Sequence, residues 1–390
     1  MQDVKIKSLK NDITVKKKKA YNIEMSLLKA LGIFAIVAGH LQWGIFAHFY
    51  AHYAFHVILF FFIAGYFLNF EPSSDKINIL NKCFQFFTKK VKTLIVPFFI
   101  YNAFYACVTV IIFHLFNRLY GQLPTLYNFF VTSFTYGDQY DISGALWFIP
   151  AFFISLVIFY PLMFVLKKIC DNKFFHLGFF LILATIGTYI SFSRFQGQPI
   201  TSAITLVCVR TLFCMFFIYL GYFYKIYLEE KIKFNINWLL SCILLQAILC
   251  MTFKNNAYFL SEGIFYDPIS PFLFSLNGIY LCLFIVKMIS PLVKENSLID
   301  KIGRNTYSIM ANHLFVAFLI SIVLFKIKHI SYDMLPMKSL FTENFLYKPE
   351  RYKYIYTIIA ILIPTYLGES FRYLKYKLKI SRDMKKEQVK

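Results

Sequence analysis

A few ionisable side chains lie inside long apolar runs of this sequence. His40, His56 and Arg210 stand in three separate runs, each about 10 Å below the same end of its run if the runs are helices. An ionisable group in an apolar layer costs ~2.5 to 3.5 kcal/mol on insertion scales, so each is a candidate functional residue. We expect the three side chains to belong to one site.

These residue types offer general base catalysis combined with charge stabilisation. A neutral imidazole can take the proton of an attacking hydroxyl, and we assign this role to His40. We also predict that His56 is a catalytic residue, because it lies in the second run at about the same depth as His40 in the first. Arg210 keeps its proton, so it is expected to stabilise a developing oxyanion or a donor phosphate.

Lys29 precedes His40 by eleven residues, which returns a helix to within about 20° of the same face, about 16 Å along the axis. One wall could therefore hold a long anionic donor such as acyl-coenzyme A, with its phosphates near Lys29 and its thioester near His40. The alternative for Lys29 is a lysine that snorkels to the membrane surface. The alternative for His40 is a hydrogen bond to a neighbouring helix.

Three further residues are candidates for substrate contact or support. Trp147 begins the fourth run, where an interfacial aromatic role is the alternative. Asn312 and His313 lie near the middle of the ninth run, where a hydrogen bond between helices competes with an active-site role.

A metal site is not expected. His48, His52 and His56 follow a spacing of four residues that can place metal ligands on one helix face, but no Asp, Glu or Cys lies nearby in the sequence to complete a site. The eight cysteines show no Cys-x-x-Cys spacing and are predicted to be apolar packing residues.

The elements that must position these residues are membrane-spanning helices. The chain is 58% hydrophobic and only 16% charged over 390 residues, which is too apolar for a soluble protein of this length. Continuous apolar runs favour helices over barrel strands, and about 20 residues cross a bilayer. We predict an all-α integral membrane bundle with about ten spans at 27–45, 49–68, 94–116, 145–166, 174–192, 203–224, 236–253, 269–286, 306–325 and 354–373.

The net charge of +21 is explained by topology rather than by nucleic-acid binding. With the N-terminus inside, 30 of the 41 Lys and Arg residues lie in cytoplasmic segments and 9 in the opposite loops. Both termini are therefore predicted to be cytoplasmic, in a multi-pass protein of the cell (cytoplasmic or inner) membrane. The predicted organisation is a basic tail at 1–23, one membrane domain at 24–375 and a second basic tail at 376–390.

Six blocks in order resemble one family, the acyltransferase family 3 membrane proteins, and within it the fucose 4-O-acetylase-like group. Lys29 and His40 fall on its first-helix motif, His56 on its FHxPLFFxxSGY block, Trp147 on its LWFL block, Arg210 on an arginine before FxxGY and His313 on its late IYxxH block. The segment KKVKTLIVPFF resembles the basic stretch before a helix-opening proline. The sequence departs from these patterns at Ser26, Lys29, Ile58, Ala64, Met310 and Ala311.

The resemblance implies O-acyl transfer, commonly of acetyl from acetyl-coenzyme A, to carbohydrates of envelope polysaccharides or their lipid-linked precursors. It also implies that the first-helix histidine is essential. The expected partners are acyl-coenzyme A as donor substrate, a carbohydrate acceptor and the lipid bilayer, with no bound cofactor and no nucleic acid. Two alternatives remain open at this point, an exporter of a polysaccharide or lipid-linked sugar and an inert scaffold for an envelope-polymer complex.

Overall fold

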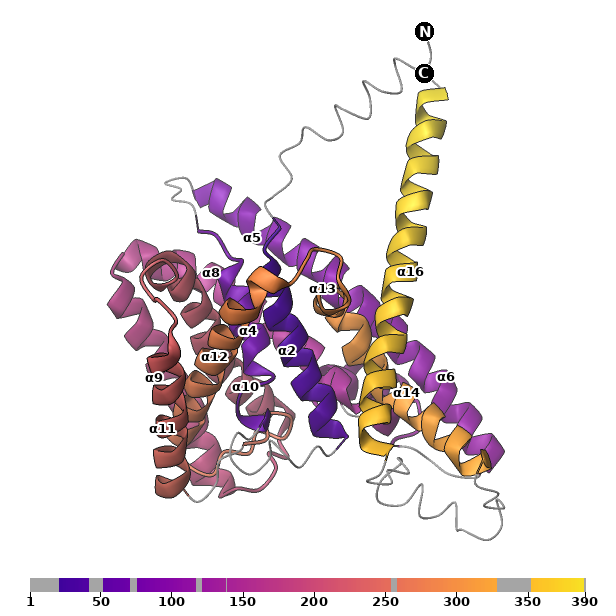
Figure 1. The fold of residues 1–390 in the computed structure, drawn as a ribbon, viewed down its shortest axis with the longest axis horizontal. Helices are drawn as coiled ribbons and strands as arrows, with labels where there is room; N and C mark the ends of the chain where they lie inside the picture. Colours follow the sequence, from indigo (N-terminus) through magenta and orange to yellow (C-terminus); the bar gives the residue numbers. More distant parts are fainter. Residues whose placement is uncertain are drawn as a thin grey trace.

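The computed structural model describes residues 21–41, 52–70, 76–116, 121–137, 139–253, 258–327 and 352–388. Every regular element in these ranges is helical (Figure 1), which confirms the predicted all-α fold. His48 and most of the N-terminal tail lie outside the described residues. The elements are α2 Ile23–His40, η1 His52–Ala54, α4 Ile58–Tyr66, α5 Lys76–Lys90, η2 Val91–Ile95, α6 Val96–Phe116, η3 Asn128–Thr132, α7 Ser133–Thr135, η4 Asp141–Trp147, α8 Phe148–Ile169, α9 Lys173–Phe195, α10 Ala203–Phe223, η5 Tyr224–Leu228, α11 Ile236–Thr252, α12 Ser270–Ile289, η6 Ser290–Leu292, α13 Leu298–Arg304, α14 Thr306–Ile327 and α16 Lys353–Gln388.

Eight helical stretches in the described ranges are long and apolar enough to cross a membrane. They correspond to the predicted runs one, three to six and eight to ten, and the seventh run forms the shorter helix α11. The basic segment from 376 onward, expected as a tail, continues α16 as a helix to Gln388. The chain is therefore a polytopic helical membrane protein.

The second predicted span is not one continuous helix. The α-helix that its described residues form, α4, has 9 residues, about 14 Å of rise against a hydrocarbon layer of ~30 Å. His52 begins the 3-10 helix η1 and His56 lies in the turn before α4, so the prediction that these histidines share one helix face is wrong. The reason is a tertiary contact with α12, where Ser275 donates a hydrogen bond to the Ala54 carbonyl at 2.6 Å.

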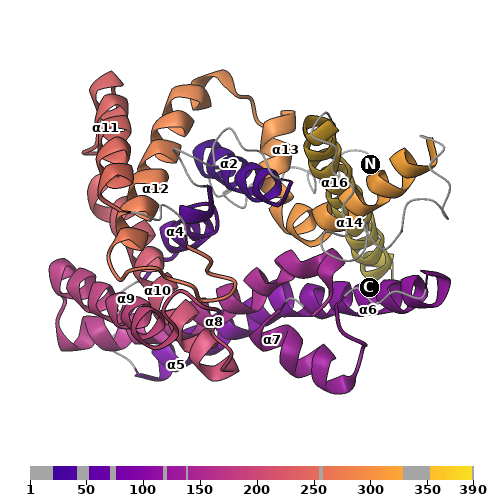
Figure 2. The same ribbon diagram turned by 90° about the horizontal axis from the view of Figure 1, so that it is seen from below.

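The site-bearing helices occupy the middle of the bundle. Figure 2 shows α2 and α4 near the centre, with α12 to their left, α13 and α14 to their right, and α8 and α10 below them. Helix α10 packs against α4, α8 and α9, and α2 packs against α4, α12, α13 and α14. These two helices carry Arg210, Lys29 and His40 into the interior.

Helices α4 and α10 cross at two glycines. A Cβ on Gly65 would lie 1.8 Å from the Ile218 carbonyl oxygen, and a Cβ on Gly221 would lie 1.8 Å from the Phe62 carbonyl oxygen. Small residues permit such close backbone contact between membrane helices.

Replacing Gly65 with alanine is therefore expected to destabilise the protein. The added methyl meets backbone, which has little room to yield, so the overpacking cost of ~1–3 kcal/mol exceeds the ~1 kcal/mol gained in helix propensity. Thermal unfolding in detergent measures the effect. Gly178→Ala on α9 is the matched control, because nothing lies within 4 Å of its added Cβ, and an equal melting temperature for the two variants would contradict the close crossing.

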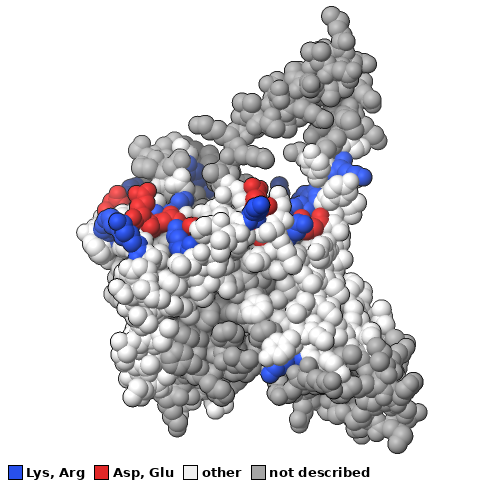
Figure 3. All heavy atoms as spheres, viewed as in Figure 1, with Lys and Arg blue, Asp and Glu red and all other residues white. Residues whose placement is uncertain are grey.

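Charged side chains gather in a band at the end of the bundle where α2 begins (Figure 3). Within it Glu24 and Lys287 form an ion pair at 2.6 Å between α2 and α12. Asp300 on α13 accepts hydrogen bonds from the Tyr21 hydroxyl, from Ser26 at 2.8 Å and from the Asn296 backbone N–H at 2.8 Å. Burial by itself raises the pKa of Asp300, but these hydrogen bonds and the nearby Arg304 outweigh it, so the pKa of this carboxyl lies below its ordinary value.

Asp300 is expected to stabilise the docking of α13 on α2 only while it is ionised. Because its pKa is lower in the folded protein, its contribution is full above the ordinary carboxyl range and is lost as the pH falls through the folded pKa. Asp300→Asn should therefore lower the free energy of unfolding by about 1.5–3 kcal/mol at pH ~7. The difference between the melting temperatures of the two proteins should shrink as the pH falls below the ordinary carboxyl range, and a constant difference would disprove the assignment.

Candidate active site

A small cavity of about 50 Å³ brings together residues from five parts of the chain. His40 ends α2, His56 precedes α4 and Trp147 ends η4. The segment 258–261 closes the other side, and Met310 on α14 contributes the remaining wall. Two of the three residues predicted to share one site, His40 and His56, therefore line one cavity.

His40 lies beside a second histidine. The ring centroids of His40 and His313 are 5.3 Å apart, with the planes tilted by 44°. Nδ1 of His313 lies 2.9 Å from the Ile309 carbonyl and 3.1 Å from the Met310 carbonyl, and carbonyls only accept, so this nitrogen carries the proton. Nε2 of the fully buried His313 is then an acceptor, and it has no hydrogen-bond partner among the described residues.

His56 is held at the rim of the same cavity by aromatic contacts. Its ring meets Tyr53 edge to face at 5.2 Å, and Tyr53 in turn lies 5.4 Å from Phe259. Tyr258, next to Phe259, is hydrogen-bonded to Ser275 at 2.7 Å, and Ser275 donates to Ala54. The turn that carries His56 and the 258–261 segment are therefore tied to the same residue of α12.

Arg210 does not line the small cavity but contacts the segments that form its wall. Its guanidinium donates to the carbonyls of Leu260 at 3.1 Å and Thr135 at 2.8 Å, and also to those of Tyr136 and Ser261. Its Cζ lies 4.9 Å from the centre of the Trp147 ring. Arg210 is 2% exposed and is not among the residues that line the cavity. The structure thus places it where it orients Trp147 and the 258–261 segment.

Arg210→Met is expected to loosen this wall. Leaving buried carbonyls unsatisfied costs ~1–3 kcal/mol each, so the melting temperature should fall by several degrees. Limited proteolysis should also cut the chain near 258–264 faster than in the wild type. Arg194→Met serves as the control because Arg194 is exposed on α9, and a similar response from both variants would contradict a clamping role for Arg210.

Trp147 and Asn312, two of the three predicted supporting residues, lie in different places. Trp147 is 9% exposed and lines the cavity, so it is not an interfacial belt residue. Asn312 instead contacts α6, where Tyr105 donates to its Oδ1 at 3.0 Å. The alternative of an interhelical hydrogen bond therefore describes Asn312.

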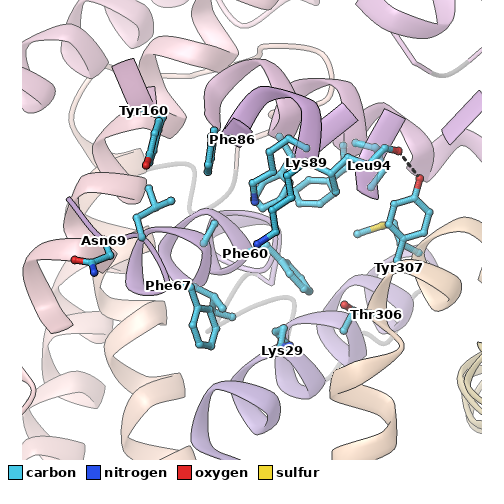
Figure 4. Close-up of a pocket in the computed structure, with 18 residues that line it drawn as sticks. Lys29, Phe60, Phe67, Asn69, Phe86, Lys89, Leu94, Tyr160, Thr306 and Tyr307 are labelled. Atoms are coloured by element: carbon cyan, nitrogen blue, oxygen red, sulfur yellow. Dashed lines mark hydrogen bonds between the residues drawn. The ribbon is translucent and has the colours of Figure 1, made fainter. Parts of the chain in front are cut away.

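A second and larger cavity, of about 490 Å³, is lined by Lys29 and is called the basic cavity below. Figure 4 shows Lys29 on α2 and Lys89 on α5 at opposite sides of it, with Phe60 between them. Lys90 also lines this cavity, and its Nζ lies 5.2 Å from the centre of the Phe86 ring. Among the described residues, its lining includes three lysines and no Asp or Glu.

Local structure explains why two adjacent lysines reach this cavity. The helix changes from α5 to the π-helical turn η2 directly after Lys90, and such turns are frequent at functional sites. Tyr307 on α14 donates to the Leu94 carbonyl within this turn at 3.0 Å (Figure 4). Phe86 stacks on Tyr160 at 4.0 Å and forms an apolar wall beside the lysines.

Lys89 and Lys90 were not predicted to be site residues. Both lie in the basic block KKVKTLIVPFF, so a signal was present, but positive charge near a span end also serves topology. Phe148 and Met310 were missed as well, although each lines both cavities. Their side-chain types carry no chemical signal, and only the packing of α14 against η4, which leads directly into α8, reveals their place.

No group of three His, Cys, Asp or Glu side chains in the described ranges is arranged to hold a metal ion.

No match was found among curated proteins or among solved structures. A family model described as an acyltransferase domain matches residues 22–368, almost the whole chain and every candidate site residue. With its polytopic helical fold, the chain belongs to acyltransferase family 3 and is a membrane-embedded acyltransferase.

Proposed function

We propose that this protein is an O-acetyltransferase of the cytoplasmic membrane. In this reaction an acyl group passes from acyl-coenzyme A to a hydroxyl of a cell-surface carbohydrate or of its lipid-linked precursor. One observation carries the proposal. The basic cavity at Lys29 and the histidine cavity at His40 meet at two shared wall residues, Phe148 and Met310.

The larger cavity suits the donor. Coenzyme A carries phosphates on a long flexible arm, and three lysines, with no carboxylate among the described lining residues, offer these phosphates an electropositive site. The volume of about 490 Å³ lies within the range of small-molecule sites. The stacked rings of Phe86 and Tyr160 add apolar lining for the adenine ring to contact.

The smaller cavity suits the chemistry. His40 takes the proton from the sugar hydroxyl as its oxygen attacks the thioester carbon. The C–O bond forms, the C–S bond breaks, and the thiolate of coenzyme A leaves and takes up the proton. His313 lies against His40 and its protonated Nδ1 is fixed by its own helix, so its role is to position the imidazole of His40.

Purified protein in nanodiscs tests this proposal directly. The protein is incubated with acetyl-coenzyme A and a panel of mono- and oligosaccharide acceptors, free thiol is measured continuously, and O-acetyl products are identified by mass spectrometry. Acceptor-dependent thiol release with an equimolar acetylated product is the expected result. Binding and transmembrane movement of the sugars without thiol release would instead identify an exporter.

In the producing cell, loss of the gene should remove O-acetyl groups from surface glycans and leave their amount unchanged. Compositional analysis of these glycans distinguishes the two functions, because loss of an exporter would reduce the glycan itself.

A further inference from the structure

The junction of the two cavities is narrow and is built from two side chains. Phe148 and Met310 are the only residues common to both linings in the described part of the chain. They are 5% and 4% exposed, so they separate the cavities rather than face lipid or water. Among the residues that the structure describes, these two side chains therefore lie between the basic cavity and His40.

The two side chains differ in how firmly they are held. The Phe148 ring is in contact with those of Phe60 at 5.7 Å, Phe61 at 5.6 Å and Phe152 at 5.1 Å. Met310 has an unbranched side chain with three rotatable bonds, a type that adapts to its surroundings. Its backbone is fixed instead, because its carbonyl lies 3.1 Å from Nδ1 of His313. One wall of the junction is therefore rigid and the other is adjustable.

The space beyond the junction is small. A water-sized group needs about 10–15 Å³ of cavity, so about 50 Å³ accommodates roughly four non-hydrogen atoms. An acetyl group has three, whereas a butyryl group has five and a hexanoyl group has seven.

We infer that Phe148 and Met310 form an acyl-length filter, which admits acetyl to the His40 cavity and excludes acyl chains of four or more carbons. This inference rests on the proposed acyl-coenzyme A donor and specifies its acyl group. Each methylene that a pocket rejects typically changes kcat/KM by ~10-fold or more, so the wild type should prefer acetyl- over butyryl-coenzyme A by at least about 10-fold.

The test compares kcat/KM for acetyl-, butyryl- and hexanoyl-coenzyme A in wild type and Met310→Ala. The alanine removes three non-hydrogen atoms from the junction, and the butyryl-to-acetyl ratio should rise by about 10-fold or more. Met310→Leu nearly conserves volume and should keep the wild-type ratio. Phe148→Leu should shift the ratio in the same direction as Met310→Ala.

Leu314→Ala is the matched control, since Leu314 is buried one turn further along α14 and lines neither cavity. It should leave the ratio unchanged. The filter would be overturned if the wild type used all three donors equally. It would also be overturned if active Met310→Ala kept the wild-type butyryl-to-acetyl ratio, or if Leu314→Ala shifted that ratio as much as Met310→Ala. Thiol release from none of the donors would overturn the proposed function itself, which separates the two failures.

Discussion

His40→Ala is expected to lower acetyl transfer by about 10²- to 10⁴-fold, the range that a positioned general base contributes. His40 lines the small cavity, and the buried His313 ring lies against it at 5.3 Å. Because the alanine leaves the basic cavity intact, binding of acetyl-coenzyme A should persist while turnover is lost. Thiol release and isothermal titration on the same preparation measure the two effects separately.

The matched control is His114→Ala, which removes an exposed histidine from α6. Both variants should reach the wild-type amount in the membrane and melt at similar temperatures. Normal transfer in His40→Ala would refute the catalytic assignment. Equal losses in both variants would show that the effect is not specific to the cavity.

Removing charge from the basic cavity is expected to raise the KM for acyl-coenzyme A. A charge-assisted hydrogen bond to a phosphate is worth ~1.5–3 kcal/mol, so Lys89→Ala with Lys90→Ala should raise KM by at least about 10-fold. The chemistry at His40 is remote from both lysines, and kcat should therefore change little. Initial rates at varied donor concentration separate the two parameters.

Lys92→Ala supplies the control, because Lys92 belongs to the same basic block but is exposed and does not line the cavity. It should leave KM unchanged. The wild-type KM should also rise with salt, and the double variant should respond less because fewer charges remain to be screened. The same KM in the double variant and in Lys92→Ala would exclude this cavity as the phosphate site.

Some of the site was predictable because it depends on periodicity along a single helix. Lys29 and His40 were placed on one face of the first span, and in α2 the two residues line the basic and the histidine cavity. His40 and His56 were predicted to share one site because they lie at similar depth in their runs, and both line the smaller cavity. This holds even though the segment with His56 is not the continuous helix that was predicted.

Other parts of the site depend on contacts between segments far apart in the chain. Arg210 was predicted to stabilise charge in the reaction, yet its donors are directed at carbonyls in 135–136 and 260–261. Asn312 contacts Tyr105 on α6, about 200 positions away. Neither orientation follows from hydropathy, because hydropathy does not specify which neighbour a buried polar group meets.

Composition and the length of the apolar runs alone determined that this protein is a helical membrane bundle, since a bilayer leaves the backbone few other ways to satisfy its hydrogen bonds. The ordered motifs alone determined its family. Only the tertiary structure decided that α4 is short, that Lys89 and Lys90 join Lys29, and that Phe148 and Met310 separate the two cavities. These features arise where helices far apart in the sequence pack together, and the local pattern of apolar and polar residues does not specify which helices will pack.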